Sequence, residues 1–201
     1  MSPTWWSASL TTVGAARTSG RHRTSGRLRC LTERMARLFV AVWPPEEVVE
    51  HLRSLRRKDQ RGIRFVPPEN WHVTLRFLGE ADEREVAAAL DELDTRDLPP
   101  TVARVGPAVD VIGGKALMIP VAGLDELARS VERATVHLGE PPRKRFVGHL
   151  TLARCARSVR MPATLGSLFE DEFPVASIAL VESRLGPAGA RYETLATWPV
   201  P

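Results

Sequence analysis

Two stretches, WHVTLRFLG (Trp71–Gly79) and HLTLAR (His149–Arg154), each contain the motif His-x-Thr-Leu, and each is patterned as a β-strand. Successive side chains of a strand point to opposite faces. The first stretch therefore places His72, Thr74 and Arg76 on one face and apolar residues on the other. A strand of this kind lines a wet cleft with its polar face and packs a core with its apolar face.

The second stretch repeats the pattern. His149 and Thr151 share one face, and leucines occupy the other. Strict alternation places Arg154 on the face opposite His149, so a substrate role for Arg154 requires a bulge or a strand end. One chain thus presents an imidazole and a hydroxyl from each of two strands.

Paired imidazoles suit the hydrolysis of a phosphodiester without a metal ion. One neutral histidine takes a proton from water, and one protonated histidine gives a proton to the leaving oxygen. Both forms are accessible near neutral pH, since the ordinary pKa of histidine is about 6.5. Thr74 and Thr151 can hydrogen-bond phosphate oxygens, and Arg76 is predicted to help hold the negative charge.

The pairing makes the motif specific. The chain has five histidines, and only His72 and His149 are followed by x-Thr-Leu. Either one alone would be read as an ordinary strand histidine bonded to a carbonyl group. His51 and His137 fall on charged, helical stretches, where we expect surface or cap positions.

Composition bounds the class of protein. The 201 residues are 43% hydrophobic and 26% charged, as in ordinary globular domains. No stretch approaches the ~20 apolar residues of a membrane span. Cys30 and Cys155 form no recognisable disulfide framework, so we expect a cytoplasmic protein.

The positive charge is concentrated at one end. The chain has 28 Lys and Arg against 24 Asp and Glu, and residues 1–34 contain six arginines and one glutamate. Residues 35–201 therefore hold 22 cations and 23 carboxylates, which argues against a general polyanion binder. Residues 1–34 are rich in Arg, Ser, Thr and Gly, and we predict a disordered extension before a domain of residues 35–201. The extension resembles a transit peptide, and Met35 is an alternative first residue.

The pattern of the remaining chain alternates strands and helices. Expected strands cover 37–43, 71–78, 102–112, 116–121, 149–155, 175–185 and 192–198. Expected helices cover 46–59, 81–93, 124–138 and, as a short one, 165–169. Each half contains one His-x-Thr-Leu strand after a helix. We therefore predict an α+β fold of two pseudo-symmetric βαβ-type lobes, with antiparallel sheets around a central cleft.

Four phrases carry a resemblance to a known family: RLFVAVWPPEEV, VPPENWHVTLRFLGE, HLTLARC and SRLGPAGARYE. Together they resemble the RNA 2',3'-cyclic phosphodiesterases, also called LigT-like proteins or 2'-5' RNA ligases, within the 2H phosphoesterases. The resemblance runs from about Met35 to Pro201. Val147-Gly148 departs from it, since the family often has Arg-Pro there.

The resemblance implies a reaction and its residues. A 2',3'-cyclic phosphate at an RNA end, or a cyclic nucleotide, would be opened to a 2'-phosphate. His72 would donate a proton to the departing 3' oxygen, His149 would activate water, and Thr74 and Thr151 would hold the phosphate. The reverse reaction would join RNA ends. We expect a monomer that needs no cofactor and no metal.

Two other functions fit parts of the sequence. The same fold without catalysis would be a binding module for RNA ends or nucleotides. A metal hydrolase could use the histidines as ligands, although no His-x-His, H-E-x-x-H or cysteine cluster accompanies them.

Overall fold

The computed structural model describes residues 34–201, except residues 59, 94, 143–144, 157–158 and 188. The disorder predicted for residues 1–33 and the position of Cys30 lie outside the described part. Arg34 lies inside it and bonds to Glu83 at 2.8 Å and to Glu182 at 2.7 Å. The last residue of the predicted extension thus contacts the folded domain.

The strands of the first half and the hairpin that closes it agree with the predicted pattern, except for one short strand at Ile63–Phe65. They are β1 (Met35–Val42), β2 (Ile63–Phe65), β3 (Val73–Asp82), β9 (Ser177–Gly186) and β10 (Gly189–Pro199). The second half contains β4 (Val102–Val105), β5 (Asp110–Ile112), β6 (Ala116–Ala122), β7 (His149–Cys155) and β8 (Asp171–Pro174). The short strands β2 and β8 were not predicted.

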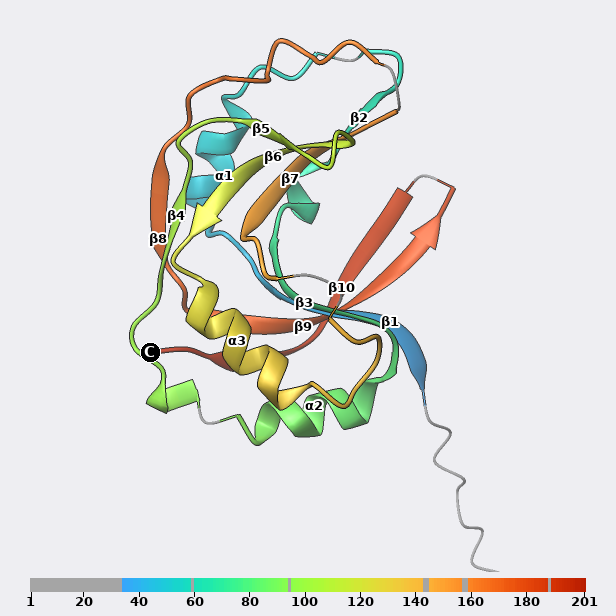
Figure 1. The fold of residues 1–201 in the computed structure, drawn as a ribbon, viewed down its shortest axis with the longest axis vertical. Helices are drawn as coiled ribbons and strands as arrows, with labels where there is room; N and C mark the ends of the chain where they lie inside the picture. The colour runs from blue at the N-terminus through green and yellow to red at the C-terminus, as the bar shows by residue number, and fades with distance from the viewer. Residues whose placement is uncertain (1–33, 59, 94, 143–144, 157–158, 188) are drawn as a thin grey trace, which may run out of the picture. The chain divides into compact units, whose positions relative to one another are not determined.

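Every strand pair in the described part is antiparallel. The order along the sheet is β10-β9-β1-β3-β7-β6-β4-β8, with β2 beside β7 and β5 beside β6 (Figure 1). Each predicted lobe is one half of this order, and the two His-x-Thr strands, β3 and β7, meet at the junction. The α+β fold of two antiparallel lobes is confirmed, and one continuous run of strands joins them.

Within the residues that the structure describes, three α-helices pack on the sheet: α1 (Glu46–Arg53), α2 (Glu83–Asp91) and α3 (Asp125–Ala134). Two 3-10 turns, Pro68–Asn70 and Thr95–Asp97, complete the regular structure. Figure 1 shows α2 and α3 side by side below the sheet. Helix α3, which follows a strand of the second lobe, packs on β3 of the first, whereas α1 of the first lobe packs on β8 of the second. Each lobe therefore covers part of the other.

The helices are shorter than predicted for local reasons. The apolar stripe that begins on α1 ends at Leu55, just beyond the helix. The three residues that follow are Arg-Arg-Lys, and they offer no apolar side chain that could extend the packing of a helix on the core. Helix α2 begins after Asp82, whose carboxylate accepts hydrogen bonds from the backbone N–H groups of Arg84 and Glu85. Helix α3 ends where Thr135 donates its hydroxyl proton to the carbonyl of Val131.

Two further predictions were wrong. Residues 165–169 form a turn and an isolated bridge between Leu168 and Ala108 in place of a helix. The expected strand 102–112 is interrupted at Gly106, which has a φ of 133°. A Cβ there would lie 2.3 Å from the carbonyl oxygen of Phe169, so only glycine fits this close approach.

Candidate active site

The register of β3 against β7 explains why the motif occurs twice. Val73 pairs with Leu150 in antiparallel fashion. Continuing this register by one residue in each direction sets His72 across from Thr151 and Thr74 across from His149. Each imidazole is thus opposite the hydroxyl of the other motif. The two histidines are diagonal neighbours, and residues in such pairs lie about 7–8 Å apart, with Cβ atoms somewhat closer.

Both imidazoles are oriented by the same local hydrogen bond. Nδ1 of His72 lies 2.7 Å from the carbonyl oxygen of Asn70, and Nδ1 of His149 lies 2.7 Å from that of Val147. A carbonyl oxygen can only accept, so each Nδ1 carries the proton and donates it. In the neutral form of either ring, Nε2 is then the atom with a lone pair for an external partner.

The two histidines open into one cavity of about 750 Å³, which Thr74 and Thr151 also line. The structure thus brings together four of the five predicted site residues. The rest of the lining holds no carboxylate, and it includes three arginines and four aromatic residues: Arg37, Arg64, Arg154, Phe39, Phe65, Phe77 and Tyr192. This composition favours an anionic ligand with flat rings.

Bulges in both motif strands change the alternation beyond the threonines. In β3, Ala41 pairs with Thr74 but Val40 pairs with Arg76, so Leu75 is an extra residue. In β7, Met118 pairs with Thr151 but Leu117 pairs with Ala153, so Leu152 is extra. One inserted residue moves every later side chain to the opposite face.

The prediction that Arg76 faces the phosphate is therefore wrong. Arg76 is only 5% exposed and lies outside the lining of the cavity. Its guanidinium donates hydrogen bonds to the carbonyl oxygens of Phe77, at 2.8 Å, and Glu140, at 2.6 Å. It links the bulge of β3 to the segment that precedes β7. Phe77, predicted as a core residue, is 37% exposed and lines the cavity.

The bulge in β7 has the converse effect on Arg154. Its side chain shares the cavity with His149 and Thr151, which meets the structural condition for contact with a substrate. Arg64 of β2 pairs with Arg154 in register and lines the same cavity. Neither arginine forms an ion pair with any carboxylate in the part of the chain that the structure describes. Both cations are therefore available to an anion in the cleft.

His72 sits in an aromatic environment. Its ring centroid lies 4.9 Å from that of Phe39, 5.0 Å from Tyr192 and 5.4 Å from Trp43. Removal from water disfavours the charged imidazolium, and this burial, with smaller effects of His149 and Arg154, lowers the pKa of His72 to about 4. The hydrogen bond to Asn70 acts in the opposite direction. His72 is thus neutral at neutral pH when the cleft holds no anion.

The hairpin of β9 and β10 forms one wall of the cavity. Asn70, two residues before His72, donates its amide proton to the carbonyl oxygen of Ala190 at 3.0 Å. A Cβ on Gly189 would lie 2.4 Å from Nη2 of Arg64, so a glycine lets this arginine pass across the hairpin. The hairpin residues of the lining lie within the phrase SRLGPAGARYE, but strand alternation alone did not assign them to the cleft, and no motif marks Arg64 and Phe65 of β2.

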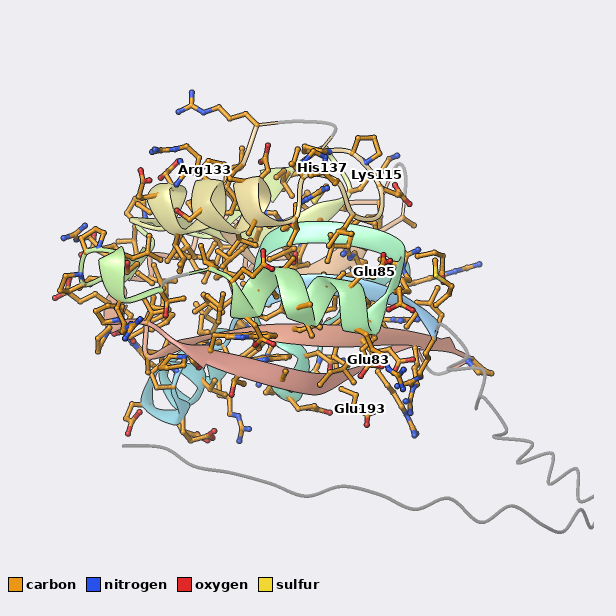
Figure 2. All side chains as sticks on the ribbon, turned by 90° about the horizontal axis from the view of Figure 1, so that it is seen from below. Glu83, Glu85, Lys115, Arg133, His137 and Glu193 are labelled. Carbon is orange, nitrogen blue, oxygen red and sulfur yellow. The ribbon has the colours of Figure 1, made fainter. Side chains whose placement is uncertain are left out.

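Metal ligands do not gather near the motif. Among the described residues, no three His, Cys, Asp or Glu side chains are grouped so that they could hold a metal ion. His51 instead pairs with Asp171 at 2.9 Å and is half exposed. His137 lies on the exposed surface after α3 and is labelled in Figure 2. No helix in the described part is long and apolar enough to cross a membrane.

Comparison with known proteins finds relatives across most of the chain. A family model described as LigT like Phosphoesterase matches residues 42–106. An RNA 2',3'-cyclic phosphodiesterase of Methanocaldococcus jannaschii is 27% identical over 173 residues, covering 81% of this chain and 99% of that protein. A protein of the same name from Thermus thermophilus is 37% identical over 175 residues, covering 79% and 87%.

Solved structures share the architecture. The crystal structure of TT0787 of Thermus thermophilus is similar with a TM-score of 0.71 and 32% identity, covering 82% of this chain and 97% of that chain. E. coli LigT in complex with 3'-AMP gives a TM-score of 0.68 at 23% identity, covering 83% and 99%, and supports the fold alone.

Proposed function

Because the chain belongs to the LigT-like phosphoesterases, we propose that it hydrolyses 2',3'-cyclic phosphodiesters at RNA ends and leaves a 2'-phosphomonoester. The curated relatives that carry the name RNA 2',3'-cyclic phosphodiesterase support this reaction for the family. The observation that carries the proposal within this chain is the convergence of two free Nε2 atoms on one cationic cleft.

The proposed step uses one imidazole on each side of the phosphorus. Water attacks phosphorus and forms a new P–O bond while the bond from phosphorus to the 3' oxygen breaks. One neutral imidazole takes the proton of the water, and one imidazolium gives a proton to the leaving 3' oxygen. Before each turnover one of the two rings is an imidazolium and the other is neutral. After the turnover the two rings have exchanged these protonation states. If the 5' hydroxyl of a second RNA end attacks phosphorus in place of water, the same two proton transfers would form a 2'-5' phosphodiester as the bond to the 3' oxygen breaks, which is the joining reaction.

The remaining groups stabilise charge. Thr74 and Thr151 lie opposite the histidines and can donate to non-bridging oxygens of the phosphate. Arg154 adds a positive charge where negative charge builds up in the transition state. This description requires no metal ion, and the protein would act as a monomer in the cytoplasm, where the buried Cys155 stays a free thiol.

An NMR titration of His72 tests its role. Burial makes the imidazolium costly, so we expect the His72 ring in the free protein to titrate near pH 4 and to be neutral at pH 7. The donor role implied for His72 requires a higher pKa in the complex. A nearby anion favours the imidazolium, so nucleoside 2'-monophosphate should raise this pKa toward neutrality. If it stays near 4 in the complex, the donor is His149.

Product analysis tests the function itself. An RNA oligonucleotide with a 2',3'-cyclic phosphate should be converted to the 2'-phosphate in excess chelator. A 3'-phosphate product would mean that the other ester bond breaks, and loss of activity on chelation would favour a metal hydrolase. Tight binding of the 2'-phosphate product without turnover of any cyclic substrate would favour the non-catalytic binding module.

A further inference from the structure

A strip of exposed cations leads from the cleft across the surface. Residues 56–64 read RRKDQRGIR, with five cations and one acid. The cationic strip is defined here as the exposed side chains outside the cavity lining on this segment and on the facing segment around residue 160: Arg56, Arg57, Lys58, Arg61 and Arg160. The strip takes no part in the proposed acid-base step, because its side chains lie outside the cavity. Another role therefore has to account for these cations.

Two chain segments build the strip. The side chain of Gln60 donates a hydrogen bond to the carbonyl oxygen of Arg160 at 2.6 Å, and the N–H of Ala156 donates to the carbonyl of Gly62 at 2.7 Å. Figure 1 shows the segments following α1 and β7 running together above β2 and β7. The two segments that carry the strip are therefore held together by hydrogen bonds.

The strip joins the cleft through β2. Arg64 ends the basic segment, pairs in register with Arg154 and lines the cavity. Arg57 lies over the ring of Trp71 at 5.1 Å, next to the first motif histidine. Positive charge thus continues from the reacting centre to the outer surface.

The cations of the strip differ from those on the helices. On α3, both Arg129 and Arg133 contact Glu126, and on α1, Arg53 contacts Glu46 and Glu50. Within the described residues, no carboxylate forms an ion pair with a member of the strip. Unpaired like charges repel one another, and a polyanion relieves that repulsion by displacing small counterions.

We propose that the cationic strip binds the sugar-phosphate backbone of an RNA chain whose cyclic end occupies the cleft. The inference rests on the proposed function and names its substrate class: a polynucleotide in preference to a free cyclic mononucleotide. Near neutrality of residues 35–201 as a whole is compatible with it, because the charge is gathered on one surface.

The experiment compares salt dependence for long and short ligands. Fluorescence anisotropy measures binding of a labelled 12-nucleotide RNA that ends in a 2'-phosphate, and calorimetry measures a nucleoside 2'-monophosphate. The test variant is Arg56→Gln/Arg61→Gln, and the matched control is Arg129→Gln/Arg133→Gln, which removes equal charge from α3. Release of about 0.7 counterion per contacted phosphate predicts that the test variant lowers the slope of log K against log salt by about 1.4.

At 0.1 M salt this change corresponds to roughly 25-fold weaker binding of the 12-nucleotide RNA. Binding of the mononucleotide should change less than two-fold in both variants, and the control should keep the full slope. Equal slopes of log K against log salt for the test and control variants would overturn the proposal that the strip binds RNA. Failure of the proposed function is distinguishable, because it appears as absent turnover of cyclic ends while the difference in RNA binding persists.

Discussion

Replacement of His72 or His149 by alanine is expected to lower kcat/KM for a 2',3'-cyclic phosphate substrate by about 10²–10⁴-fold. Each substitution removes one Nε2 from the cleft and leaves the other without a partner for the second proton transfer. The double variant should lose little more than the worse single variant, because groups that act together in one step are not additive. Initial rates on a cyclic mononucleotide measure the effect.

The pH profile separates catalysis from folding. The wild-type profile of kcat/KM should be bell-shaped, and each single variant should lose one limb. His137→Ala is the matched control, since His137 is exposed and away from the cavity lining. Its activity should equal that of the wild type. Full activity in either motif variant would remove the two-histidine mechanism.

Arg154→Met is expected to reduce kcat/KM by about 10- to 150-fold, the equivalent of one charged hydrogen bond of about 1.5–3 kcal/mol. Arg154→Lys keeps the charge without the two-pronged geometry and should recover part of the loss. The positive charge of Arg154 also lowers the pKa of His72, so Arg154→Met should raise that pKa in the free protein. An NMR titration of the His72 ring reports this shift independently of turnover.

Arg104→Met controls for the loss of one surface arginine. Arg104 lies on β4, two thirds exposed, with a distant contact to Glu172 at 3.8 Å. It should retain wild-type kcat/KM. If kcat/KM of Arg154→Met falls by less than three-fold, Arg154 does not stabilise the phosphate, and other groups in the cleft bind it.

Strand alternation in the sequence was sufficient to place His72 and Thr74, and His149 and Thr151, on cleft-facing positions. It failed two residues further on in both strands. Leu75 and Leu152 are ordinary apolar strand residues, and nothing in them distinguishes a bulge from regular pairing. A bulge is defined by how a strand pairs with its neighbours, which the strand's own sequence does not show. Without the bulge, alternation placed Arg76 in the cleft and Phe77 in the core, and both assignments were wrong.

The residues that line the cleft around the two motifs were also not predicted. Arg37 of β1 and Arg64 of β2 come from strands that pair with the motif strands only in the folded sheet, and Tyr192 comes from β10, which pairs with β9 at the end of that sheet. The short strand β2 has three residues, and its pairing with β7 decides where Arg64 points. Sequence periodicity over so few residues cannot separate a strand from a loop.

The packing of each lobe against segments distant in sequence has a consequence for synthesis. Strand β1 pairs with β9, and α3 packs on β3, so the first sheet needs elements from the far end of the domain. On the ribosome, His72 and Thr74 emerge early but have no completed wall beside them. The cleft assembles only after β9 and β10 have left the exit tunnel, and a nascent chain carrying the first motif alone has no active centre.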